Sequence, residues 1–190
     1  SREATPDDWA RAKTNLADAL QILGKSGEPQ RLQEAVAAYS EALAIQTRER
    51  VPAEWAMTMC NRASALLAMG PQGDQATLLE AVHALDEAAQ VFTRETSPCG
   101  WATIKNNQGA VLLALGQRGD EQALKRAIVV FREALEVRAT KTMAADWATT
   151  SNNLGNALLA IFPDGVVQRL RGGVALDADW MNLVGPLVLL

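Results

Sequence analysis

The feature that most constrains this chain is an internal repeat of 46 residues. Tryptophan occurs at positions 9, 55, 101 and 147, so neighbouring copies are separated by a constant interval. Self-similarity at a fixed period of this length is typical of proteins built from stacked copies of one supersecondary unit. The same interval relates three further sets of residues: Asn15, Asn61, Asn107 and Asn153; Leu20, Leu66, Leu112 and Leu158; Leu32, Leu78, Leu124 and Leu170.

Each repeat begins with a segment of helical periodicity. In the first repeat, Trp9, Leu16, Leu20 and Leu23 fall on one side of an α-helix, and we interpret them as a buried stripe. A proline that suits a first helical turn precedes the stripe, and a glycine that suits a left-handed helix end follows it. These residues are Pro6, Pro52 and Pro98, and Gly24, Gly70 and Gly116. We expect first helices over 7–23, 53–69, 99–115 and 145–161.

A second helical pattern follows a polar turn in each repeat. Leucine, alanine and larger apolar residues recur at steps of three and four, which predicts second helices over 29–49, 75–95 and 121–140. Apolar residues make up 48% of the chain but aromatic residues only 5%, which favours close helix packing over β-structure. The expected fold is all-α, an α-solenoid of stacked antiparallel helix pairs.

Two strings of residues resemble the tetratricopeptide repeat. They are Asn153-Leu154-Gly155-Asn156-Ala157-Leu158 in the first helix and the segment Ala35 to Leu43 in the second. The resemblance implies a right-handed superhelix that binds other polypeptides, although the family's usual unit is about 34 residues. The longer unit is similar to long-period repeats of bacterial multidomain proteins and to kinesin light chain-like repeats. Residues 1–163 would hold three and a half to four helix pairs, with units starting near 6, 52, 98 and 144.

The fourth repeat departs from the pattern after residue 163. Gly173, Asp177 and Trp180 stand where the third repeat has Ala127, Phe131 and Ala134. We expect 164–190 to be a degenerate last helix that caps the array, or alternatively a self-association segment that makes a homo-oligomer. The chain opens with Ser1 in place of Met, so we also expect it to have been cut from a longer protein.

The side of each first helix opposite the tryptophan stripe is the expected concave, inner face. Asparagine dominates this face, and an amide that both donates and accepts can bind the backbone of an extended peptide whatever its sequence. The candidate peptide-binding residues are Arg11, Thr14, Asn15, Cys60, Asn61, Ser64, Thr103, Asn106, Asn107, Thr149, Asn152, Asn153 and Asn156.

Other interpretations of these residues remain open. The asparagines could instead bond to neighbouring helices and set the stacking angle. Cys60 suits a small inner-face residue better than a reactive thiol, and the tryptophans suit packing between units better than ligand anchoring. A clamp for a C-terminal carboxylate is disfavoured because Arg11 is the only cation on this face, with Lys13 and Lys105 one step away.

Composition narrows the function classes. The net charge is −4 with the basic residues scattered, which argues against nucleic acid as a partner. One histidine and two separated cysteines leave no metal or cofactor site, and no catalytic set is recognisable. No apolar run is long enough for a membrane span, so we expect a soluble protein, and two cysteines that fit no disulfide framework favour a reducing, cytoplasmic setting. The predicted function is a non-enzymatic scaffold for a peptide or protein of unknown identity; the alternative is a structural or oligomerising segment of a larger bacterial protein.

Overall fold

The computed structural model describes residues 3, 5–70, 74–138 and 144–161, and all regular structure within these residues is helical. The all-α prediction is therefore confirmed for this part of the chain. The segment 164–190, expected to form a cap or a self-association surface, lies outside the described residues. Seven helices are described: α1 (Pro6–Lys25), α2 (Gln30–Leu43), α3 (Pro52–Ala68), α4 (Gln75–Ala88), α5 (Pro98–Gly116), α6 (Glu121–Arg138) and α7 (Ala144–Ile161).

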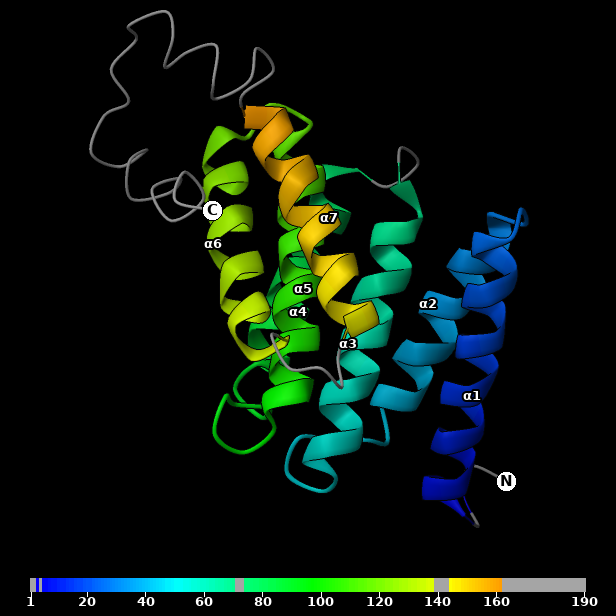
Figure 1. Cartoon of the computed structure of the whole chain (residues 1–190). Helices are drawn as coiled ribbons and strands as arrows, with labels where there is room; N and C mark the ends of the chain where they lie inside the picture. Colours follow the sequence, from blue (N-terminus) through cyan, green and yellow to red (C-terminus); the bar gives the residue numbers. More distant parts are fainter. Residues whose placement is uncertain (1–2, 4, 71–73, 139–143, 162–190) are drawn as a thin grey trace, which may run out of the picture.

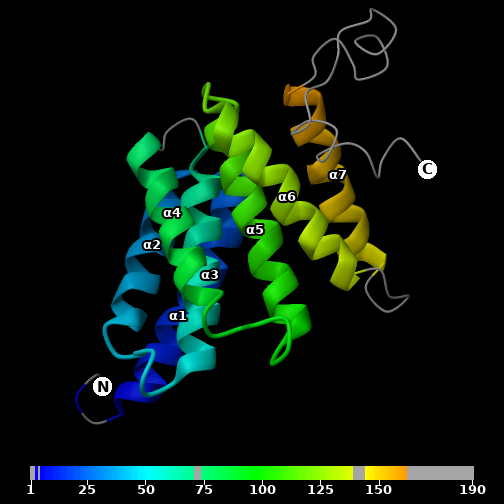
Figure 2. The same ribbon diagram turned by 90° about the vertical axis from the view of Figure 1, so that its left-hand side faces the viewer.

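These helices pack in consecutive antiparallel pairs. α1 packs on α2, α3 on α4 and α5 on α6, and successive pairs touch through α2 and α3, α4 and α5, and α6 and α7. We call α1, α3, α5 and α7 the A helices and α2, α4 and α6 the B helices; each A helix also contacts the next A helix. Figure 1 shows α1 and α6 on opposite sides with α3 to α5 between them, and Figure 2 shows α7 on the side away from α1 to α4.

The helix starts follow from local chemistry. Pro6, Pro52 and Pro98 are each the first residue of an A helix, where the missing N–H of proline costs no hydrogen bond. The B helix α4 instead begins with a side-chain cap, because Asp74 accepts a hydrogen bond of 2.7 Å from the backbone N–H of Thr77. In the described residues, no helix has the length and apolar character needed to cross a membrane.

Two B helices end earlier than the sequence pattern predicts. α2 ends at Leu43 rather than at residue 49, and α4 ends at Ala88 rather than at residue 95. In both, a residue shortly after the end of the helix places its side chain toward the interior. Gln46 is only 6% exposed, and Phe92 packs against the main core cluster. The apolar pattern in the sequence continues beyond Leu43 and Ala88 because apolar residues of the connecting loops are also partly buried.

The repeated glycine at the end of the A helices serves close packing more than helix termination. Of the three, only Gly70 is left-handed, with φ of 55°. Gly24 and Gly116 lie inside their helices, and the prediction that they are left-handed ends was wrong. A Cβ on Gly24 would lie 2.6 Å from the side chain of Leu32, and one on Gly116 would overlap Leu124 in the same way. Glycine therefore lets the A helix approach the start of its B helix.

The predicted buried stripe of α1 is largely wrong. Leu16 is 48% exposed and Leu23 is 44% exposed, whereas Leu154, three repeats after Leu16, is 6% exposed. In later units this side of the A helix packs toward the preceding B helix, as the hydrogen bond from Gln108 in α5 to Asp86 in α4 shows. No helix before α1 is present in the described residues, so its leucines face outward. The periodicity was correct, but the burial of this side depends on a preceding B helix, which the described residues do not include for α1.

Candidate functional site

The recurring asparagine of the A helices forms a hydrogen bond to the preceding A helix in every later unit. We call Asn61, Asn107 and Asn153 the asparagine row. Each side chain is half-buried and donates through Nδ2, and each acceptor lies on the A helix one unit earlier. The bonds run from Asn61 to Asp18 Oδ1 (3.1 Å), from Asn107 to Cys60 Sγ (3.2 Å) and from Asn153 to Asn106 Oδ1 (3.2 Å). The row is therefore a polar joint between successive A helices.

One acceptor of this joint, Asn106, is shared by two donors. Its Oδ1 accepts from Asn153 and also from the hydroxyl of the fully buried Thr150, 3.1 Å away, while its Nδ2 donates to Asn107 over 3.3 Å. Asn106 thus uses both ends of its amide within the protein. Thr150 also contacts the Asp146 carbonyl and Arg138. The bonds from Thr150 and Asn153 to Asn106 are therefore the ones that join α7 directly to α5.

At the other end of the row, Asp18 is held by Tyr39. The phenol donates to Asp18 Oδ1 over 2.5 Å, and burial and the neighbouring carboxylate together raise the pKa of Tyr39 well above its usual range. The amide of Gln21 lies 3.0 Å from both Tyr39 Oη and Ser64 Oγ, in the orientation where its nitrogen donates to Tyr39 and its oxygen accepts from Ser64. Asp18 and the candidate residue Ser64 are therefore also linked to neighbouring helices.

The predicted site residues differ in how far they reach solvent. The hydroxyls of Thr14, Thr103 and Thr149 each bond to a carbonyl one turn earlier in their own helix. Ser64 is half-buried, like the asparagine row. The exposed members, which we call the A-helix surface, are Arg11, Asn15, Thr149, Asn152 and Asn156.

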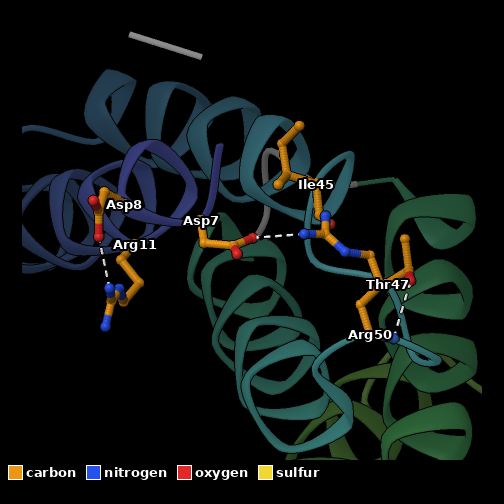
Figure 3. A network of polar contacts seen from close by, with 6 residues as sticks. All are labelled: Asp7, Asp8, Arg11, Ile45, Thr47 and Arg50. Atoms are coloured by element: carbon orange, nitrogen blue, oxygen red, sulfur yellow. Dashed lines mark hydrogen bonds and ion pairs between the residues drawn. The ribbon is translucent and has the colours of Figure 1, made fainter. Parts of the chain in front are cut away.

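Arg11 is engaged locally at the edge of this surface. Its guanidinium donates to Asp8 one turn earlier over 2.6 Å, as Figure 3 shows. Beside it, Arg50 from the loop before α3 donates to Asp7 over 3.0 Å and to the carbonyl of Ile45 over 3.1 Å. The loop is thereby tied to the start of α1. Both ion pairs are well exposed, so each contributes little to stability.

Cys60 lies beneath the A-helix surface rather than on it. It is 2% exposed, and its Sγ is the acceptor for Asn107. Burial raises the pKa of the thiol, an effect that the hydrogen bond from Asn107 partly offsets. The protonated thiol that results is a packing group and a poor nucleophile.

The junctions between units contain polar pairs that the sequence analysis did not find. Thr58 of α3 donates to Gln46 over 2.8 Å. Two repeats later, Arg138 and Thr150 stand at the positions equivalent to Gln46 and Thr58, and Arg138 donates to Thr150 over 2.5 Å. Arg138 is 4% exposed and also donates to the Asp146 carbonyl and to Thr103, so it links α5, α6 and α7. Burial lowers the pKa of the Arg138 guanidinium below its usual value. At the intervening junction the equivalent residues, Phe92 and Ile104, are apolar. Comparing residues at twice the period would have revealed this alternation.

No group of three or more His, Cys, Asp or Glu side chains within the described ranges is arranged to hold a metal ion. Comparison with family models, with curated proteins and with solved structures gave no match. The geometry of the A helices and of their surface is therefore what supports a functional interpretation.

Proposed function

We propose that this chain is an α-solenoid of tetratricopeptide-like helix pairs that holds an extended polypeptide along the A-helix surface. In this proposal it is a binding scaffold rather than an enzyme. We place it in the cytoplasm on the grounds of its two widely separated cysteines. The partner is a protein or peptide, and neither nucleic acid nor a membrane is involved.

The observation that carries the proposal is the regular joint made by the asparagine row. Each A helix is bonded to the one before it by the same residue, so side chains at equivalent positions recur once per unit along the A helices. An extended peptide also has a constant repeat, and amide side chains can pair with its backbone. Asn15, Asn152 and Asn156 are exposed and suited to this contact.

The asparagine row would have a supporting part in binding. Asn61 and Asn153 use Nδ2 for the joint, and among the described residues no hydrogen bond engages the Oδ1 of either side chain. These two oxygens could accept from a peptide N–H. The two interpretations of the asparagines given by the sequence, stacking and peptide binding, are therefore compatible at these positions.

The test separates binding from folding by changing exposed residues only. A peptide is first selected from a random display library against the full chain, and its affinity is measured for a triple variant, Asn15→Ala, Asn152→Ala and Asn156→Ala. We expect binding about tenfold weaker, since a few lost hydrogen bonds amount to roughly 1.4 kcal/mol. The matched control changes two exposed B-helix residues, Gln33→Ala and Gln122→Ala. Equal affinity of the triple variant and wild type would contradict the proposal.

A structural role in a larger assembly is the second candidate. Leu16 and Leu23 of α1 are exposed at positions that are buried in α7 and α5, where Leu154 and Leu115 pack. The face of α1 thus has the character of an interior junction. Light scattering of wild type and of Leu16→Ser with Leu23→Ser distinguishes the candidates. A wild-type oligomer that the double variant dissociates supports this role, and a monomer in both cases contradicts it.

A further inference from the structure

The A helix and B helix of the first and third units are bridged by the same lysine–carboxylate pair. Lys13 Nζ lies 2.6 Å from Glu41, and two repeats later Lys105 Nζ lies 2.9 Å from Glu133. Both ammonium groups also lie over the tryptophan one turn earlier in their helix. The distances to the ring centroids are 5.4 Å for Trp9 and 5.3 Å for Trp101. A cation between a carboxylate and an aromatic face is stabilised by both.

The middle unit keeps the carboxylate and the ring but lacks the cation. Trp55 and Glu87 stand at the equivalent positions, and the lysine is replaced by Met59. Met59 and Trp55 pack against the main core cluster, so the thioether is drawn toward the interior. Glu87 is half-buried, and in the described part of the chain no hydrogen bond or ion pair engages its carboxylate.

A cavity of about 450 Å³ opens at this place, between α3 and α4. Met59, Leu79 and Ala84 form its apolar wall. Its polar wall lies along α4 and consists of Glu80, His83 and Glu87. The cavity also contains Arg62, but that guanidinium is already paired with Glu80 and with Ser40 of α2. Of the two carboxylates that line the cavity, Glu80 is therefore paired with Arg62, and Glu87 is the one without an ion pair to any described residue.

We propose that this cavity receives a lysine or arginine side chain from a polypeptide partner, which restores in trans the pair that Lys13 and Lys105 form in cis. The apolar wall contacts the aliphatic part of the incoming side chain, and Glu87 accepts its charged end. A long cationic side chain has this combination of an apolar stem and a charged head. The cavity lies between an A helix and its B helix, away from the A-helix surface, so the site adds a specificity element that the backbone contacts proposed above do not supply.

The test is an NMR titration of the isotope-labelled full chain with two pentapeptides, acetyl-Gly-Gly-Lys-Gly-Gly-amide and the same peptide with norleucine in place of lysine. The lysine peptide should shift the amide signals of residues 59–62 and 80–87, and the norleucine peptide should not. Glu87→Gln should weaken binding of the lysine peptide by about fivefold or more. Added salt should weaken it too, because the cavity is open to solvent.

Two further variants make the result decisive. Met59→Lys supplies the missing lysine within the chain and should abolish binding of the peptide. Glu49→Gln removes an exposed carboxylate elsewhere and should leave the titration unchanged, as should the triple variant of the A-helix surface. Equal responses to the two peptides, shifts confined to other helices, or an unaltered titration in either Glu87→Gln or Met59→Lys would overturn the proposal. Circular dichroism of each variant confirms that it is folded.

Discussion

Asn106 and Asn153, which lie on consecutive A helices, are joined by a hydrogen bond of 3.2 Å from the Nδ2 of Asn153 to the Oδ1 of Asn106. The hydroxyl of Thr150 donates to the same oxygen over 3.1 Å. One amide oxygen thus organises the contact between α5 and α7. The equivalent contacts at the other junctions use Cys60 and Asp18 as acceptors, so the joint is retained although its chemistry varies.

Replacement of Asn106 should therefore destabilise the protein more than replacement of its exposed equivalent. We expect Asn106→Ala to lower the free energy of unfolding by about 1–2 kcal/mol, because the half-buried amide of Asn153 loses its acceptor and the Thr150 hydroxyl keeps only the Asp146 carbonyl. Asn152→Ala, at the same position one repeat later, should change it by less than about 0.5 kcal/mol, since this side chain is exposed. Urea denaturation followed by circular dichroism measures both. Similar losses would show that Asn106 does not organise the junction.

Two glycines at equivalent positions should respond to alanine in opposite directions. A Cβ on Gly109 of α5 would lie 2.6 Å from the ring of Phe131, which is fully buried and cannot move aside. We expect Gly109→Ala to cost about 1–3 kcal/mol, as overpacking does. A Cβ on Gly155 of α7 would meet nothing within 4 Å, so Gly155→Ala should gain about 0.5–1 kcal/mol from helix propensity.

Thermal unfolding of the two glycine variants shows whether each substitution raises or lowers the stability of the protein. A double variant, Gly109→Ala with Phe131→Leu, reproduces the Ala63 and Leu85 pair of the second unit and should recover part of the loss. Stabilisation by Gly109→Ala alone would mean that the ring of Phe131 does not pack on this glycine.

Arg138 should be replaceable by glutamine but not by alanine. Its guanidinium links α5, α6 and α7 through hydroxyl and carbonyl acceptors. Arg138→Ala leaves a cavity and a buried hydroxyl with one partner fewer, so we expect a loss of about 2–4 kcal/mol. Arg138→Gln supplies the amide that Gln46 offers to Thr58, but only once the last turn of α6 opens as α2 does before Gln46. We therefore expect it to lose about half as much stability as Arg138→Ala. Denaturant titrations measure the stability of both variants. Equal losses of stability in Arg138→Ala and Arg138→Gln would show that glutamine cannot take the place of Arg138.

The buried thiol of Cys60 should make stability fall in alkaline solution. Because burial raises its pKa in the folded state, the unfolded chain loses this proton first as the pH rises. The contribution of Cys60 is therefore complete below the ordinary thiol pKa of about 8.5 and is lost progressively above it. Unfolding between about pH 7 and pH 9.5, below the ordinary pKa of tyrosine, measures the effect. In a Cys99→Ser background, adding Cys60→Ser should flatten the decline, and an unchanged slope would assign it to another group.

The helix pairs could be predicted from the sequence because the period and the apolar pattern are local and repeated. Each A helix begins at the expected proline or at its equivalent, Ala144. The ends of the B helices could not be predicted, because the signal that ends them is tertiary. Gln46 leaves α2 to meet Thr58, whereas the longer Arg138 reaches Thr150 while still part of α6.

The candidate peptide-binding residues were predicted only from their direction around the helix axis. In the structure some of them are buried and others are exposed. Cys60 and Asn15 fall on the same predicted face, yet Cys60 is covered by the next A helix and Asn15 is exposed. Helical periodicity gives the direction of a side chain relative to its own helix axis, but not the distance to the neighbouring helix. For the same reason the leucines of α1 were taken as core residues.

The most direct test of the account is site-specific photocrosslinking between the full chain and a peptide selected for binding to it. A photoreactive benzoylphenylalanine replaces one exposed residue at a time, either Asn15, Met57 or Thr149 on the A helices, or Ala37 or Val129 on the B helices. If an extended polypeptide lies along the A helices, the first three positions crosslink to the peptide and the last two do not. Crosslinks from Ala37 and Val129, with none from the A-helix positions, would contradict the account.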